Sequence, residues 1–167
     1  ACINLACIAA SQGAMAVIID MDPQRSTISW GKRRGDGSNP ETVVAQVYDL
    51  ERVIKECRSA GIAWCFLDLP GRSDPIMSAG LKASHLILIP ARPSETDLEG
   101  ARDVVAAAHR LRKPYAFLMN IAPPRSSRAQ DVSAQLRADP PPRRRVTWQR
   151  WLPAAAALVI AVPLAVV

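Results

Sequence analysis

Short apolar runs alternate along this chain with longer segments in which apolar residues recur every three or four positions. The runs are continuous, which is typical of strands covered on both faces of a parallel sheet. They predict strands at residues 16–19, 43–47, 62–67, 85–89 and 115–119. Helical spacing predicts helices at residues 1–12, 26–34, 50–60, 74–82, 94–112 and 126–138. The alternation indicates an α/β fold, with a mostly parallel sheet, right-handed crossovers and helices on both faces.

Polar or turn-forming residues follow the predicted strands. Asp20 and Asp22 come directly after the first strand, and Asp68 after the third. Asn120 follows the last strand. The carboxyl ends of parallel strands lie along one edge of the sheet, where ligands bind. Two carboxylate sites at one edge suggest a hydrated Mg²⁺, because this ion often keeps several waters and takes few protein ligands beside phosphate oxygens.

The four cysteines form no metal-binding pattern. They are Cys2, Cys7, Cys57 and Cys65, and none belongs to a Cys-x-x-Cys pair. The chain has only two histidines, so we expect no zinc site. Each cysteine lies in an apolar helix or strand pattern, which predicts buried thiols in a reducing cytosol.

Five segments match the motifs of one protein family in the family's own order. They are residues 4–13, 20–24, 66–72, 89–97 and 118–125. In that order they resemble the helix after the phosphate-binding loop, the Asp-x-Asp-Pro-Gln motif, the Walker B strand with its Asp-Thr-Pro-Gly turn, the Pro-x-x-Pro-Ser-x-x-Asp stretch and the adenine-binding loop. Leu69 stands where the turn usually has Thr. Residues 1–138 therefore resemble the ParA/MinD family of deviant Walker-type P-loop ATPases, most closely the small plasmid-partition ParA proteins.

The resemblance implies three catalytic carboxylates. Asp22 would position or activate the attacking water, and Asp20 and Asp68 would hold the water shell of Mg²⁺. Phosphoryl transfer needs positioning and charge stabilisation more than covalent chemistry, which suits such a set. Taken singly, Asp20 with Asp22, or Asp68 with the Pro-Gly that follows it, also fits a plain turn after a strand.

Three further residues would bind the nucleotide by the same resemblance. Gly71 would sense the γ-phosphate through its backbone N–H, and Asn120 and Pro123 would contact the adenine. Asn120 also fits a local cap or turn. Ser94 and Asp97, in the stretch before them, resemble a capping box and fit helix capping better than catalysis.

The implied function is ATP-dependent partition of plasmid or chromosomal DNA in the cytoplasm, with the protein associated with the nucleoid. Such a protein would bind ATP and Mg²⁺, dimerise across the nucleotide, bind DNA without sequence preference and hydrolyse ATP with a ParB-like partner. Non-specific DNA binding would be electrostatic. Arg72, Arg125 and Arg128 fit contacts to DNA phosphates, but each fits a solvated surface better.

The phosphate-binding loop of the family is not found in these residues. Its Lys-Gly-Gly-x-Gly-Lys-Thr sequence would lie just before Ala1, and no other Gly-x-x-x-x-Gly-Lys stretch occurs. We therefore expect a catalytically impaired chain, or alternatively a non-catalytic ParA-like binding remnant or subunit. The strand that leads into this loop is central in the family's sheet. Its loss is expected to leave a gap lined by unpaired backbone groups.

The last part of the chain departs from the α/β pattern. We interpret residues 1–139 as the ParA-like domain and residues 140–167 as a foreign or frame-shifted tail, which contributes four of the six net positive charges. That charge fits a patch for nucleic acid or anionic lipid, or a solvated run. Residues 151–167 carry no charge, and a tail-anchored membrane protein is a further alternative.

Overall fold

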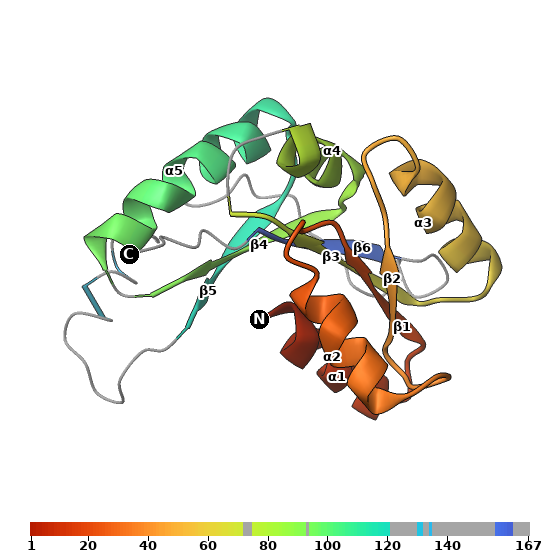
Figure 1. Ribbon diagram of the computed structural model, residues 1–167. Helices are drawn as coiled ribbons and strands as arrows, with labels where there is room; N and C mark the ends of the chain where they lie inside the picture. Colours follow the sequence, from red (N-terminus) through yellow and green to blue (C-terminus); the bar gives the residue numbers. More distant parts are fainter. Residues whose placement is uncertain (72–74, 93, 121–129, 132–133, 135–155, 162–167) are drawn as a thin grey trace.

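The computed structural model describes residues 1–71, 75–92, 94–120, 130–131, 134 and 156–161. They contain one six-stranded sheet in the order β2-β1-β3-β6-β4-β5 (Figure 1). The strands are β1 (Ala16–Asp20), β2 (Glu41–Val44), β3 (Trp64–Leu69), β4 (Leu86–Ala91), β5 (Tyr115–Met119) and β6 (Ala156–Ala161). The helices are α1 (Cys2–Ser11), α2 (Ser26–Arg34), α3 (Leu50–Ser59), α4 (Pro75–Ala83) and α5 (Glu95–Arg110). All neighbouring strands pair in parallel, which confirms the predicted α/β fold with a parallel sheet.

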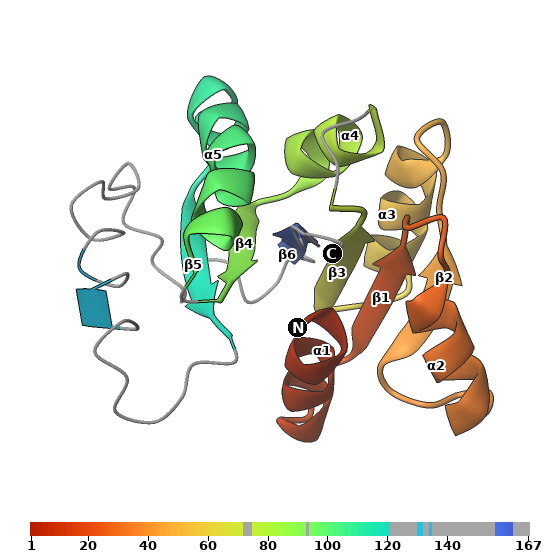
Figure 2. The ribbon, with the colours of Figure 1, turned by 60° about the vertical axis from the view of Figure 1, so that its left-hand side comes forward.

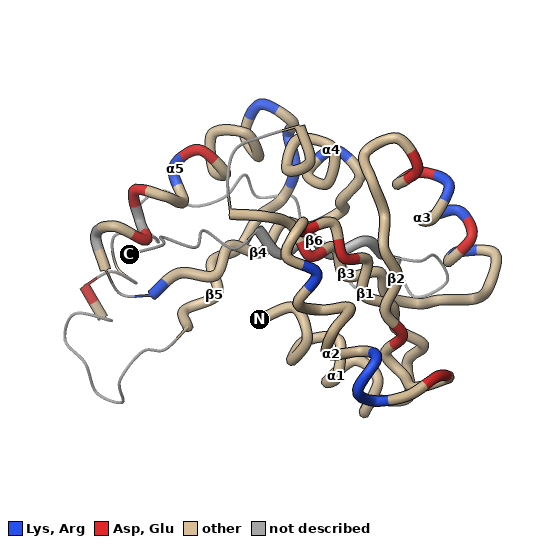
Figure 3. Tube along the Cα trace, in the orientation of Figure 1, with Lys and Arg blue, Asp and Glu red and all other residues tan. Residues whose placement is uncertain are grey.

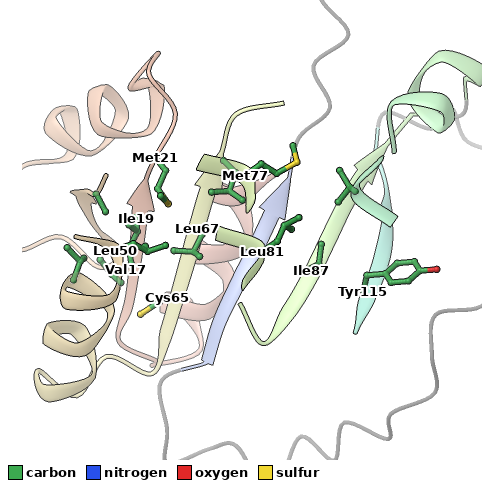
Figure 4. Close-up of a cluster of buried hydrophobic side chains, with 14 of the residues drawn as sticks. Val17, Ile19, Met21, Leu50, Cys65, Leu67, Met77, Leu81, Ile87 and Tyr115 are labelled. Carbon is green, nitrogen blue, oxygen red and sulfur yellow. The ribbon is translucent and has the colours of Figure 1, made fainter. Parts of the chain in front are cut away.

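Helices cover both faces of this sheet, as predicted. Helices α1 and α2 lie on one face, and α3, α4 and α5 lie on the other (Figures 1 and 2). Successive side chains of a strand point to opposite faces, so β1 serves two cores. Val17 and Ile19 pack in the core under α3, α4 and α5 (Figure 4), and Ala16 and Ile18 pack against α1. Burial on both faces explains why β1 is apolar along most of its length.

Strand β2 starts and ends earlier than predicted. The Asn39 side chain fixes its start, because its Nδ2 donates to Ala14 O at 2.8 Å and its Oδ1 accepts from Ala16 N at 3.0 Å. Glu41 is thereby placed in register with Val17. The strand ends at Val44, and Ala45 N then donates to Asp20 O at 3.3 Å.

Strand β4 continues through Pro90 to Ala91, past the predicted end at residue 89. Ile87 N donates to Pro114 O on the β5 side, so the odd-numbered residues of β4 direct their amides toward β5. The nitrogen of Pro90 is on the opposite side, where the pairing with β6 has already ended at Leu88. Among the described residues no ladder partner faces this nitrogen, so the missing N–H breaks none of the described pairings.

The expectation of a gap in the centre of the sheet is wrong, because β6 fills that position. All six β6 residues pair with β3, from Trp64↔Ala156 to Leu69↔Ala161. On its other side β6 pairs with residues 86–88 of β4. Helix α4 packs over β3 and β6, and a Cβ added to Gly80 would lie 2.6 Å from Leu69 Cδ1. Residues 156–161 of the proposed tail therefore belong to the sheet.

Other expectations for the C-terminal region are tested only in part. Of the helix predicted at residues 126–138, positions 130, 131 and 134 are described and are helical. Residues 140–155 and 162–167 lie outside the described part of the chain. Among the helices that the structure describes, none has the length and apolar character needed to cross a bilayer.

We expect the pairing of β6 to control stability, and Val159 tests it. Val159 lies opposite Leu67 of β3 and Ile87 of β4, so Val159→Pro removes an N–H from the middle of a central strand. The unpaired partner alone costs roughly 1–3 kcal/mol. Urea unfolding should show a lower midpoint or no cooperative transition. Val159→Ala keeps the N–H and is the control, and equal midpoints for the two variants would contradict this role.

Candidate functional site: a carboxylate cluster at the carboxyl edge of the sheet

The carboxyl ends of β1 and β3 place two acidic residues side by side. Asp20 and Asp68 are register partners in these adjacent strands. Met21 N continues the ladder by donating to Asp68 O at 2.9 Å. Figure 3 shows acidic positions gathered where the two strands end, with a basic position beside them. The structure thus brings together two of the three predicted catalytic carboxylates by backbone pairing alone.

Asp20 is fully buried, and backbone N–H groups hold its carboxylate. Oδ1 accepts from Asp22 N at 3.0 Å, and Oδ2 accepts from Ile28 N, in the first turn of α2, at 3.1 Å. The Arg25 guanidinium donates to the backbone oxygen of Asp20 at 2.6 Å and lies 3.9 Å from Oδ1. These contacts fix the side chain in one orientation at the strand end.

Asp22 lies in the turn between β1 and α2. Its Oδ1 accepts from Gln24 N at 2.8 Å, and its backbone oxygen accepts from Arg25 N at 3.1 Å. This is the local turn that the sequence offers as the simpler interpretation. Asp22 is half-buried, so its carboxylate also keeps access to solvent beside Asp20.

Thr27 is a buried member of the site that the sequence analysis missed. Its hydroxyl donates to Asp68 Oδ2, and the residue is 1 % exposed. Arg25 adopts a left-handed backbone conformation, with φ of 52°, immediately before α2 begins. That turn directs the first turn of α2 at both strand ends. The sequence gives no signal for this contact, because nothing in it distinguishes Thr27 from the other hydroxyl residues of α2.

The pKa values of both aspartates reflect this environment. Burial raises the pKa of Asp20, and the N–H groups of Ile28 and Asp22 offset part of that rise. Burial also raises the pKa of Asp68, where the Thr27 hydroxyl opposes the shift and the charges of Asp20 and Asp22 add to it. Two carboxylates that are costly to ionise together are stabilised by a bound cation.

The donor set fits a hydrated divalent cation. Two carboxylates and one hydroxyl are hard oxygen donors of the kind that Mg²⁺ prefers. Across the described ranges, no three His, Cys, Asp or Glu side chains are grouped as a metal site would require. An ion held here by Asp20 and Asp68 would therefore keep most of its waters, as the sequence analysis expects.

The predicted nucleotide-binding residues lie farther apart than Asp20 and Asp68 do. Gly71 lies two residues after the end of β3, at the same edge as Asp68. Asn120 is exposed at the end of β5, and its N–H donates to Ala91 O at 2.9 Å. Strands β6 and β4 separate β5 from β3, which places the two ends roughly 14 Å apart at the usual strand spacing. Pro123 lies outside the described residues, as do Arg72, Arg125 and Arg128.

Ser94 and Asp97 cap helix α5. Ser94 is the N-cap residue, and its Oγ accepts from Asp97 N at 3.3 Å. The Asp97 carboxylate does not complete the capping box that the sequence predicts. It accepts instead from Arg92 N at 2.8 Å, and from Arg92 Nε and Nη2, each at 3.1 Å. These contacts tie the end of β4 to the start of α5.

Comparisons with known proteins found no match for this chain: no family model matches it, and no curated protein does.

We expect the Asp97 cap to give a pH-dependent contribution to stability. Burial alone would raise the pKa of Asp97, but the hydrogen bonds from Arg92 and Ser94 outweigh it and lower the pKa. A depressed pKa stabilises the fold above the unfolded value near 4, and this contribution is lost as the pH falls through the folded value. Asp97→Asn should cost roughly 1–2 kcal/mol of unfolding free energy at pH 7.

Urea titrations of wild type and Asp97→Asn between pH 2 and pH 7 measure this difference. It should shrink below about pH 4. Asp103→Asn, at an exposed position of the same helix, is the matched control and should cost little at either pH. A cost for Asp97→Asn that stays constant over the whole range would contradict the electrostatic origin.

Proposed function

We propose that this chain contains the Mg²⁺ and nucleotide site of a ParA-like partition ATPase with a P-loop NTPase type of fold. One observation carries the proposal: Asp20 and Asp68 meet in register at the carboxyl edge, and the Thr27 hydroxyl bonds to Asp68. That edge is where open parallel sheets bind ligands. Asp20 is buried and Asp68 is half-buried, and carboxylates whose pKa values are raised by desolvation are frequent at functional sites.

Each of these residues has a definite task in this proposal. Asp20 and Asp68 hold the water shell of Mg²⁺, and the Asp22 carboxylate, with its access to solvent, positions the attacking water. The metal ion, when bound, neutralises charge on the terminal phosphates of ATP. Arg25 orients Asp20 through the bond to its backbone oxygen. Gly71 and Asn120 are the proposed contacts to γ-phosphate and adenine at the same edge.

The proposed site lacks part of what hydrolysis requires. Phosphate binding in P-loop proteins uses a Gly-rich loop whose backbone N–H groups and lysine surround the phosphates. The 167 residues contain no such Gly-Lys loop. We therefore propose that this chain by itself binds the cation without turning over ATP. ParB-like protein, DNA and a second copy of the chain are the partners that the proposed function implies.

A non-catalytic ParA-like subunit is the second candidate. The acidic pair Asp20 and Asp68 is present without a Gly-Lys loop, and this combination favours a non-catalytic subunit. Binding of a cation and of a partner protein needs no hydrolysis. A tail-anchored membrane protein is the weaker alternative, because residues 156–161 of the candidate anchor are a sheet strand.

Binding of Mn²⁺, followed by electron paramagnetic resonance as a probe for Mg²⁺, tests the acidic pair. Asp68→Asn keeps an oxygen that can accept from Thr27 but removes the charge. It should weaken binding at least about tenfold, which is about 1.4 kcal/mol. Asp36→Asn, in an exposed loop, is the matched control and should bind as wild type does. Equal affinity of all three proteins would overturn the proposed metal site.

Steady-state release of phosphate from ATP tests the proposal that this chain by itself does not turn over ATP. The purified 167-residue chain with Mg²⁺ should show no more activity than its Asp22→Ala variant, because the phosphate-binding loop and its lysines are missing from the sequence. Magnesium-dependent turnover above that of Asp22→Ala would refute the assignment of an impaired enzyme.

A further inference from the structure

Arg25 places a positive charge next to the carboxylates that are proposed to hold a cation. Its Nη1 atom donates to the backbone oxygen of Asp20 at 2.6 Å and lies 3.9 Å from Asp20 Oδ1. The second distance is too long for a hydrogen bond, so the guanidinium lies near this carboxylate without bonding to it. The Arg25 side chain is 30 % exposed, whereas that of Asp20 is 0 % exposed. A ligand from solution can therefore reach a cationic group beside a buried acid.

A second arginine at the same edge is engaged differently. Arg92 follows β4, and its Nε and Nη2 atoms both donate to the Asp97 carboxylate, each at 3.1 Å. This bidentate pair commits the Arg92 guanidinium to a carboxylate of its own chain. Within the part of the chain that the structure describes, Arg25 donates from Nη1 alone, to a carbonyl oxygen. Its guanidinium therefore keeps donors for the oxygen atoms of a phosphate.

The backbone at Arg25 adopts a conformation that is costly for any residue with a side chain. Its φ of 52° lies in the left-handed region, immediately before α2. Arg112 has the same φ, but it follows α5, where a left-handed residue commonly ends a helix. Arg25 instead follows the turn after β1. Glycine would adopt this conformation with less strain, so an arginine here is better explained by a role of its side chain.

The Arg25 charge opposes the binding of a bare cation at Asp20. The Asp20 carboxylate already accepts from the N–H groups of Asp22 and Ile28, at 3.0 and 3.1 Å. A metal ion at this carboxylate would in addition be repelled by the guanidinium. An anion that binds together with the metal ion removes this repulsion, because it can accept charge-assisted hydrogen bonds from Arg25 and coordinate the metal ion.

We propose that Arg25 is a phosphate-binding residue, through which the acidic edge selects a metal–polyphosphate complex over the free cation. Asp20 and Asp68 hold the hydrated metal ion, and the Arg25 guanidinium binds oxygen atoms of the phosphate chain that accompanies it. The ligand class is a divalent cation with a diphosphate or triphosphate chain. This inference rests on the proposed cation site, and it gives a role to the residue that directly follows the Asp-x-Asp-Pro-Gln motif.

Calorimetric titration with two ligands tests this selection: MnCl₂ alone, and Mn²⁺ bound to inorganic tripolyphosphate. The unmodified chain should bind the tripolyphosphate complex more tightly than Mn²⁺ alone. Arg25→Gly removes the guanidinium but keeps the N–H that donates to Asp22 O and the oxygen that accepts from Ser29 N. It should bind Mn²⁺ alone at least about threefold more tightly, because the competing charge is gone. It should bind the complex at least about tenfold more weakly, because charge-assisted hydrogen bonds are lost.

Opposite changes for the two ligands separate this role from a structural one, because damage to the site would weaken the binding of both. Arg25→Asn also tolerates the left-handed conformation and should reproduce the result of Arg25→Gly. Arg33→Gln, at an exposed position in the last turn of α2, removes the same charge and should bind both ligands as wild type does. Urea unfolding checks that each variant keeps its fold.

The outcomes distinguish the failure of this inference from the failure of the proposed cation site. If wild type binds Mn²⁺ but prefers it to the tripolyphosphate complex, the role of Arg25 is overturned and the cation site stands. Affinities that change in the same direction for both ligands, or that stay as in wild type, overturn that role as well. If wild type binds neither ligand, the cation site fails and the inference fails with it.

Discussion

The two backbone ladders that β6 forms with β3 and β4 hold this sheet together. β3 and β4 do not pair with each other, because α4 carries the chain from one to the other past the position that β6 fills. Such a connection leaves room for one strand between β3 and β4, which are about 9–10 Å apart. The N–H and C=O groups of both strands line this space. Only an extended segment can pair with the backbone groups of both neighbouring strands. The arrangement of β1, β2 and β3 relative to β4 and β5 depends on that segment.

The local pattern was sufficient for elements whose neighbours are close in the sequence. Continuous apolar runs predicted β1, β3, β4 and β5, and periodic apolar positions predicted the helices that cover them. The pattern failed for β6, because a run of Ala, Leu, Val and Ile has the same local appearance in a buried strand and in a membrane segment. Its pairing with Trp64–Leu69, far away in the sequence, decides between these alternatives. The end of β4 was missed for a related reason, since only the pairing with β6 shows that no described ladder residue faces the nitrogen of Pro90.

The candidate site also contains some residues that the sequence predicts and others that it does not. Asp20 and Asp68 could be predicted, since each ends an apolar strand and parallel strands end at one edge. Thr27 could not, because the choice among the hydroxyls of α2 depends on the helix phase, which the left-handed turn at Arg25 sets. The partner of Asp97 was also missed, because a capping box describes contacts within a helix and the donor, Arg92, precedes it. Residue type and strand order predicted which carboxylates lie together, and non-local geometry selected their hydrogen-bond partners.

The order of the strands also limits what the acidic edge can do. A ligand that contacts both Asp68 and Asn120 must cross the carboxyl ends of β6 and β4, because these strands lie between β3 and β5. The end of β4 is held by the three bonds from Arg92 to Asp97. The six residues of β6 carry no polar side chain, so within this strand only the backbone can meet a phosphate. The edge therefore offers acidic side chains at β1 and β3 but no cationic side chain from β6. That asymmetry supports the proposed binding of a cation without turnover.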